Sequence, residues 1–294
     1  MYSRAKYKDI DYNEWLHLKD PVGTLKYDGA SFFIPVSSDG SLSFLSRRPS
    51  VKGGFPDRTE SLPHLTAKKL PEYAGNVYNV ELIHTGKSKD AVESHRVVSG
   101  ILNSLPARAI NTQLQIGPVR AVLHNVINPE FSTYKEKLLH MKQLEKDFGN
   151  PEILFVATPH ITRNDIHKLI ERTKSSNQEG VVVTSLTTPE YENIRYKIKH
   201  KITHNLRVID IVQEIDKDGN PKQSMGALIC ADSKGNPVAK VGTGFTRNQR
   251  IDAWTNPTNW LGKGIQVESM GFSVNALRSP VYNGDADGDI DTLS

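Results

Sequence analysis

The chain has 294 residues, of which 37 % are hydrophobic, enough for one large globular domain or two unequal ones. No run of 18 apolar residues occurs, so we expect no transmembrane helix and no contact with a membrane, and we expect the polar N-terminus to be neither a secretory signal nor an anchor. The only cysteine, Cys230, excludes an internal disulfide, so a cytoplasmic location is expected. The net charge of +4 is mildly basic although the last twelve residues hold four Asp, which is compatible with a polyanionic partner such as nucleic acid.

In the first two thirds of the chain, predicted strands and helices alternate after an N-terminal loop and a short helix. An Asp39-Gly40 turn is typical of a hairpin, and residues 49–75 are predicted to be a loop or an insertion. Thr133 and Glu136 form a capping box that opens a helix, which ends at Gly149. The other helices are expected at 90–105 and 162–176, and the strands at 32–36, 42–47, 78–83, 119–127, 153–157, 179–185 and 193–202.

From about residue 205 the pattern changes to short strands separated by turns such as DKDGNP and DSKGNP, with one helical stretch, TRNQRIDAW. Several short strands with one intervening helix indicate a small closed barrel. We therefore predict an α+β protein of two domains, 1–204 and 205–294.

The stretch TLKYDGAS, residues 24–31, places Lys26 just before a turn, where a lysine is either a surface charge or a nucleophile. In the strand predicted around YKIKH, alternate residues share a face, which places Arg195, Lys197, Lys199 and Lys201 on one side. Four cations on one face repel one another unless an anion lies in front of them, and a polyphosphate would serve.

Neighbouring positive charge would also lower the pKa of Lys26 and make its amine nucleophilic. Attack on an α-phosphorus would release pyrophosphate and leave a lysyl phosphoramidate. In the VEL strand, Glu81 faces away from Val80 and Leu82, so it can point into a cleft while they fill the core.

Five segments in this order resemble the motifs of the covalent nucleotidyltransferases: KYDG at 26–29, SR at 46–47, VEL at 80–82, EGVV at 179–182 and YKIK at 196–199. The chain is most similar to the small ATP-dependent DNA ligases of bacteriophages. This resemblance implies a nucleotidyltransferase (ATP-grasp-like adenylation) domain of antiparallel sheets with helices, followed by an OB-fold barrel. It also implies a monomer in a bacterial or phage-infected cell that uses ATP and magnesium (or manganese) to seal nicked duplex DNA in replication, repair or recombination.

The resemblance assigns a role to each matching residue. Lys26 would be the adenylated nucleophile, and Lys197 and Lys199 would contact the α-phosphate and the departing pyrophosphate. Arg47 would contact the ribose or the phosphates, Glu81 the ribose hydroxyl, and Glu179 with Glu81 a divalent metal. His124 is the candidate for adenine contact, and Arg278 in LRSP is similar to the start of the last family motif.

Three features depart from the family pattern. Ser31 stands where many relatives have an arginine that binds the nucleotide or the nick. After Arg278 the chain continues with acidic rather than basic residues, and only 25 residues precede Lys26, so we expect no N-terminal DNA-binding domain and no NAD-specific domains.

Two other functions are compatible with the motifs, an RNA ligase of the same superfamily and a catalytically inactive nucleic-acid-binding relative. Residues 283–291 match the first nine positions of an EF-hand loop, but Ser294 replaces its final glutamate. We therefore expect a solvated acidic tail there in preference to a calcium site.

Overall fold

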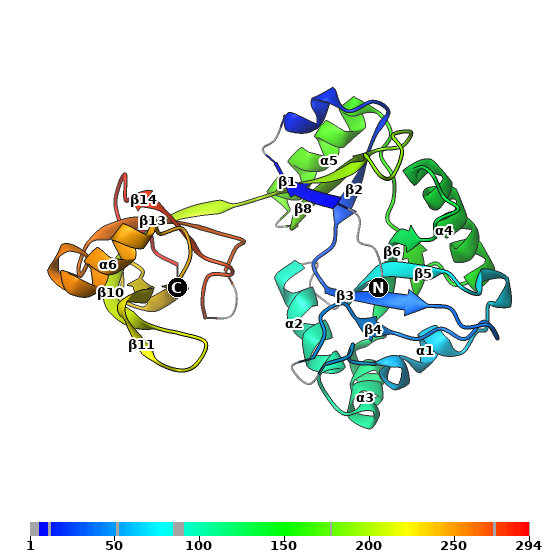
Figure 1. Ribbon diagram of the computed structural model, residues 1–294, viewed down its shortest axis with the longest axis horizontal. Helices are drawn as coiled ribbons and strands as arrows, with labels where there is room; N and C mark the ends of the chain where they lie inside the picture. Colours follow the sequence, from blue (N-terminus) through cyan, green and yellow to red (C-terminus); the bar gives the residue numbers. More distant parts are fainter. Residues whose placement is uncertain are drawn as a thin grey trace. The chain divides into compact units, whose positions relative to one another are not determined.

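The computed structural model describes residues 6–10, 13–50, 53–84, 91–176, 178–272 and 275–293, and it divides into two compact units, 1–200 and 201–294. The predicted start of the 90–105 helix and Ser294 of the EF-hand pattern lie outside the described residues. Within the described part of the chain, no helix is both long and apolar enough to span a membrane. The protein is a mixed α/β structure of three sheets with helices packed on them (Figure 1).

The first unit contains a five-stranded sheet, β4-β3-β5-β6-β7, and a four-stranded sheet, β1-β9-β8-β2. Both are mixed, because β6 pairs with β7 and β1 pairs with β9 in parallel, whereas we expected antiparallel sheets. The strands are β1 Lys6–Asp9, β2 Pro21–Lys26, β3 Ala30–Pro35, β4 Leu45–Ser46, β5 Val77–Ile83, β6 Arg120–Ile127, β7 Leu154–Val156, β8 Gly180–Ser185 and β9 Ile194–Lys199.

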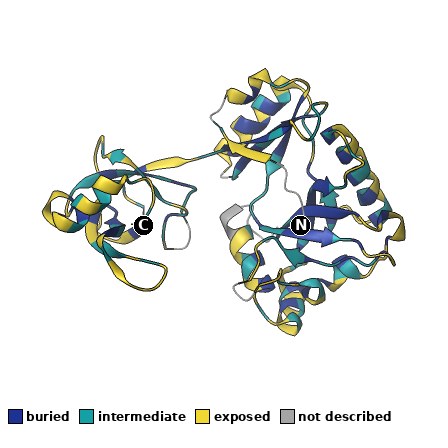
Figure 2. Cartoon of the chain, in the orientation of Figure 1, coloured by how far each residue is buried: buried dark blue, intermediate teal, exposed yellow. Residues whose placement is uncertain are grey.

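The helices of this unit lie outside the sheets and expose their outer faces (Figure 2). They are η1 Glu14–His17, η2 Thr59–Ser61, α1 Pro63–Thr66, η3 Pro71–Tyr73, α2 Ala91–Leu102, α3 Pro106–Ile116, α4 Tyr134–Phe148 and α5 Arg163–Ser175. The predicted capping box opens α4, and Gly149 ends it in the left-handed conformation, because glycine carries no Cβ to oppose a positive φ.

The two faces of β5 differ in what they contact. Tyr78, Val80 and Leu82 are buried and pack in one apolar cluster with residues of α2, α3 and α4. Asn79 and Glu81 alternate with them and line a cavity on the opposite face. The strand periodicity therefore builds the core and the cavity wall from one segment.

The second unit is a five-stranded sheet in the order β12-β11-β10-β13-β14, with α6 packed on β11. A parallel bridge pairs Thr243, which follows β12, with Val281 at the start of β14, so the two edges of the sheet contact each other. The elements are β10 Ile202–Ile215, β11 Pro221–Ala231, β12 Pro237–Val241, α6 Arg247–Thr255, η4 Pro257–Asn259, β13 Gly264–Ser269 and β14 Val281–Asp285. The domain boundary expected between residues 204 and 205 lies inside β10. This strand begins earlier in the chain than the alternation of apolar residues from which we predicted it.

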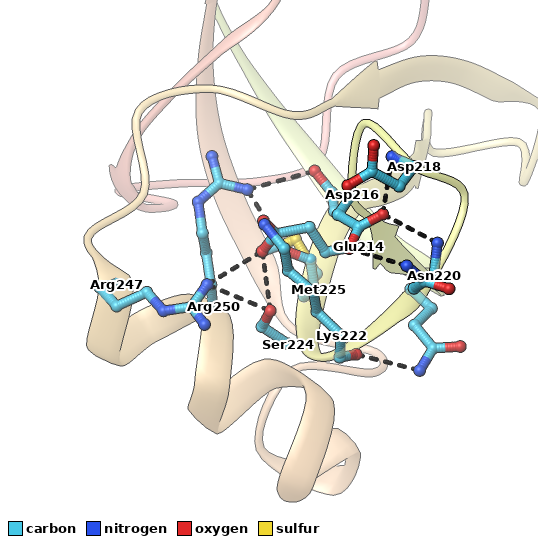
Figure 3. A network of polar contacts seen from close by, with 11 residues as sticks. Glu214, Asp216, Asp218, Asn220, Lys222, Ser224, Met225, Arg247 and Arg250 are labelled. Carbon is cyan, nitrogen blue, oxygen red and sulfur yellow. Dashed lines mark hydrogen bonds and ion pairs between the residues drawn. The ribbon is translucent and has the colours of Figure 1, made fainter.

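A polar network connects the β10–β11 hairpin to α6 in the second unit (Figure 3). Glu214 on β10 accepts hydrogen bonds from Lys222 at 2.8 Å, Ser224 at 2.7 Å and Arg247 at 3.0 Å. Arg250, one turn further along α6, donates to the carbonyl of Met225 at 3.2 Å. The Lys222 hydrogen bond is the main cause that lowers the pKa of Glu214 to about 2.

The acidic C-terminal segment exposes Asp285, Asp287 and Asp289, as expected of a solvated segment, but several of its carboxylates have partners. Asp285 ends β14 and pairs with Lys263 at 2.6 Å, and Asp287 accepts a hydrogen bond from Asn205 at 3.1 Å. Asp291 lies 3.5 Å from the His204 ring. These carboxylates have partners within the second unit, so the segment packs as part of that unit.

Candidate active site

A cavity of about 760 Å³ in the first unit is lined by residues of both sheets. All seven site residues predicted in this unit line it: Lys26, Arg47, Glu81, His124, Glu179, Lys197 and Lys199. They come from β2, β5, β6 and β9 and from the residues that follow β4 and precede β8. Segments up to 173 residues apart in the sequence therefore meet around one space.

Lys26 is the last residue of β2, and it pairs across the sheet with Gly180, the first residue of β8. Its side chain is 20 % exposed, and its Nζ forms an ion pair with the carboxylate of Glu179. Lys26 is therefore held at the cavity wall by a carboxylate that was itself predicted to bind a metal.

Gly29 and Gly180 are required by close backbone approaches. A Cβ at Gly29 would lie 2.1 Å from the carbonyl oxygen of Leu82, and one at Gly180 would lie 2.0 Å from that of Ile198. Gly180 also has a φ of +143°, which favours glycine. These glycines let the Lys26 turn and the Glu179 turn contact neighbouring strands.

Glu81 lies beside the Lys26 turn, where its Oε1 accepts a hydrogen bond from the Gly29 amide at 3.2 Å. Burial raises the pKa of Glu81 to about 8, and the nearby Glu179 adds to the shift while Lys26 opposes it. Burial therefore favours the protonated form of Glu81 near neutral pH.

Ser31, the position of the missing arginine, is opposite Glu81 in the β3–β5 pair, and both line the cavity. Arg47 is adjacent, because its backbone amide donates to the Ser31 carbonyl at 3.1 Å. A cation is thus present next to Ser31, although it comes from the segment after β4.

Lys197 and Lys199 share a partner that sequence reasoning missed. Asp9 on β1 lies 3.0 Å from the Nζ of Lys199 and 3.9 Å from that of Lys197. The Tyr7 ring, also on β1, lies 4.7 Å from the Lys197 Nζ. Burial lowers the pKa of Lys197, and Lys199, Lys26 and Arg47 lower it further, against the attraction of Asp9.

Three of the four cations in the expected stripe, Arg195, Lys197 and Lys199, line the cavity, whereas Lys201 is not among its lining residues. Arg195 is buried, donates to the Asn125 side chain at 2.7 Å and lies 3.6 Å from Glu190. Lys201 belongs to the second unit and pairs with Glu268 at 2.7 Å. Lys197 and Lys199 are the lysine pair of this strand at the cavity, and the buried Arg195 lies beside them in its wall.

His124 is half-buried on β6, at a bulge where Val80 pairs with Leu123 and Asn79 with Asn125. Burial lowers its pKa to about 3, and Arg195, Lys26 and Arg47 contribute. His124 therefore presents a neutral ring to the cavity.

His95 on α2 also lines the cavity and was not predicted. Its Nδ1 lies 2.8 Å from the Gly29 carbonyl oxygen and 3.7 Å from the Asp28 carboxylate. His95 thus contacts the turn that follows Lys26. A lone histidine in an amphipathic helix carries no sequence signal for this contact.

Arg278 lies in the second unit, in the turn before β14. Its amide donates to the Gly271 carbonyl at 2.9 Å, and its carbonyl accepts from Met270 at 3.0 Å. The cavity belongs to the first unit, and Arg278 is part of a different fold unit from the other predicted site residues.

Two carboxylates, Glu81 and Glu179, line the cavity and are the candidate metal ligands. Glu81 and Glu179 are close enough for one charge to raise the pKa of the other. Among the described residues no three or more His, Cys, Asp or Glu side chains form a metal cluster. Magnesium commonly binds one or two carboxylates and completes its shell with water and phosphate oxygens, so this pair fits such an ion.

The comparison with known proteins found similar structures but no similar sequences. No family model matches the sequence, and no curated protein matches it significantly. A Lig E DNA ligase, from a structure–function study of DNA binding with a minimal scaffold, superposes with a TM-score of 0.70 at 15 % identity and covers 97 % of this chain and 100 % of its own. This chain has the fold of that DNA ligase. A protein named Pmar-Lig_PreS3 has a TM-score of 0.71 at 14 % identity, covering 96 % of this chain and 67 % of its own. The ligase-like fold predicted from the motifs is confirmed.

Proposed function

We propose that the protein is an ATP-dependent DNA ligase that seals nicks in duplex DNA. One observation carries the proposal: Lys26, Glu81, Glu179 and the lysine pair line a single cavity in a chain with a DNA ligase fold. The cavity volume of about 760 Å³ is large enough for a nucleoside triphosphate, since ligand pockets measure roughly 300–1,000 Å³.

Lys26 is the nucleophile of the proposed first step. Its Nζ loses a proton and bonds to the α-phosphorus of ATP, while the bond from that phosphorus to pyrophosphate breaks. Lys197 and Lys199 attract the phosphate charge, which makes pyrophosphate a better leaving group. AMP then passes to the 5′-phosphate of the nick, and the 3′-hydroxyl displaces AMP.

The nucleoside would bind in the same cavity. His124 offers a neutral ring to the adenine, Glu81 hydrogen-bonds a ribose hydroxyl, and Arg47 contacts the ribose or the phosphates. Glu179 and Glu81 would hold a divalent magnesium ion, which supplies charge neutralisation at the phosphates when it is bound. Glu179 would then be shared between this ion and Lys26, since it pairs with Lys26 in the protein alone.

The second unit is proposed to be an OB-fold barrel that grips the duplex together with the adenylation unit, in a monomer. The contact between the edges of its sheet, at Thr243 and Val281, supports a closed barrel. Contacts to DNA would be mainly with phosphate and sugar, so affinity should fall steeply as salt rises. Arg278 is the residue of this unit that we assign to nucleotide binding.

Incubation with α-³²P-labelled ATP tests the proposal. The wild-type protein should become labelled, and the label should pass to nicked DNA in a chase, whereas Lys26→Ala should stay unlabelled. Labelling of the alanine variant would refute the lysyl-AMP mechanism. Parallel substrates with RNA at the nick separate a DNA ligase from an RNA ligase, and parallel labelling with NAD tests the choice of ATP.

A further inference from the structure

The contact between β1 and the lysine pair is specific in its geometry. β1 runs parallel to β9 with Asp9 opposite Lys197, and the Ile10 amide donates to the Lys197 carbonyl at 3.1 Å. This backbone pairing places the Asp9 carboxylate between the two ammonium groups, at 3.0 Å from Lys199 and 3.9 Å from Lys197. The position of Asp9 is thus set by the sheet and not by a free loop.

The carboxylate is ionised there. Partial burial opposes ionisation, but the Lys199 hydrogen bond and the charges of Lys199, Lys197 and Lys26 together lower the pKa of Asp9. At neutral pH an anion of the protein itself therefore lies against the two lysines that the proposed reaction needs for phosphate.

A polyphosphate can displace Asp9 from the two lysines. The Asp9 side chain is 62 % exposed, and ion pairs of exposed groups are weak because water screens them. A polyphosphate carries several negative charges and can contact both lysines at once, so it outcompetes a single carboxylate.

We propose that Asp9 is a built-in competitor of pyrophosphate at the Lys197–Lys199 pair. This inference rests on the proposed function. Asp9 balances part of the positive charge of the two lysines in the free protein. It leaves them when the β- and γ-phosphates of ATP bind, and it returns when pyrophosphate departs.

The return of Asp9 has a consequence for the direction of the reaction. In the reverse step a pyrophosphate oxygen attacks the phosphorus of lysyl-AMP, the P–N bond breaks, ATP forms and Lys26 recovers a proton. Pyrophosphate must first displace Asp9 from the lysine pair to bind. Asp9 therefore protects the adenylated protein from reversal at a given pyrophosphate concentration.

Direct binding of inorganic pyrophosphate tests the competitor role without any catalytic step. Titration calorimetry on the full-length protein should give a Kd for pyrophosphate roughly two- to fivefold lower in Asp9→Asn than in wild type, the range for an exposed ion pair. Asp9→Glu keeps the carboxylate and should bind like wild type. Glu14→Gln is the matched control, because it removes the same charge from the neighbouring exposed pair with Lys8.

A second measurement follows the reverse reaction. When the isolated AMP adduct is treated with pyrophosphate, ATP release should be half-maximal at a lower pyrophosphate concentration in Asp9→Asn. An unchanged or higher Kd in Asp9→Asn would overturn the proposal, and a higher one would show that Asp9 positions the lysines or holds a metal. If wild type forms no adduct with ATP, the proposed function fails, while the calorimetry still decides the role of Asp9.

Discussion

Ser31 and Glu81 lie directly opposite each other on the antiparallel strands β3 and β5, and both face the cavity. Cross-strand neighbours interact through their side chains, so the residue at 31 controls the environment of Glu81. A serine there leaves Glu81 without a cationic neighbour on β3. Burial then dominates and raises the pKa of Glu81 to about 8.

Replacing this serine by arginine should add a phosphate ligand to the cavity. We expect Ser31→Arg to bind ATP roughly tenfold more tightly, the lower end for a hydrogen bond to a charged group. Titration of the Lys26→Ala background with ATP measures binding without turnover. Unchanged ATP affinity combined with a lower pKa of Glu81 would show that the arginine pairs with Glu81 instead.

The pKa of Glu81 predicts how stability depends on pH. The folded-state pKa of about 8 lies above the ordinary value of 4.5, so between these values the folded protein binds more protons than the unfolded chain. Stability contributed by this group is therefore present at low pH and lost as pH rises towards 8, by about 1.4 kcal/mol per pH unit within that window.

Glu81→Gln isolates this effect, because glutamine keeps the shape and cannot ionise. Thermal unfolding from pH 5.5 to 8 should show the wild type losing stability relative to Glu81→Gln as pH rises. Parallel pH profiles for the two proteins would contradict the raised pKa.

His124 should contribute to nucleotide affinity through its ring and not through charge. Since its pKa is about 3, the ring is neutral at neutral pH. Loss of one base-stacking contact costs about 1–3 kcal/mol, so His124→Ala should raise the KM for ATP at least fivefold. His124→Phe keeps a flat ring and should stay near wild type; equal losses in both variants would point to the hydrogen-bonding role of the imidazole.

The site residues were predicted from the sequence more completely than the helices and strands that carry them. The motif residues Lys26, Glu81 and Glu179 line one cavity, because the motifs through which the chain resembles the covalent nucleotidyltransferases mark them in the sequence. The approach of Asp9 to Lys199 depends on a parallel strand pairing across 190 residues, which leaves no local pattern. Arg195 has the same alternation as the lysines, and its contacts with the buried Asn125 and with Glu190 distinguish it.

Missed elements have equally specific causes. α3 was not predicted. The residues that it buries, Ala109 and Gln113, are a small and a polar side chain, whereas its Leu114 is 81 % exposed, so large apolar residues do not mark its buried face. β14 was not predicted, because the residues around Asp285 are acidic and are not typical of a strand. Lys263 balances the charge of Asp285 in the structure. The strand predicted at 193–202 ends at Lys199, and β10 begins at Ile202, where the chain passes between the two units.

The Glu214 network predicts acid sensitivity in the second unit. The folded-state pKa of about 2, caused mainly by the Lys222 hydrogen bond, lies below the ordinary value of 4.5. The stabilisation is therefore present above about pH 4.5 and lost as pH falls towards 2.

Removing the charge with Glu214→Gln should lower the Tm at pH 7, and the difference from wild type should shrink as the pH is lowered to 3. Asp218→Asn is the control from the same hairpin, where the backbone amide of residue 218, not its carboxylate, bonds Asp216. An equal Tm change at pH 7 in both variants would mean that general charge balance, and not the contacts to Lys222 and Arg247, stabilises the hairpin.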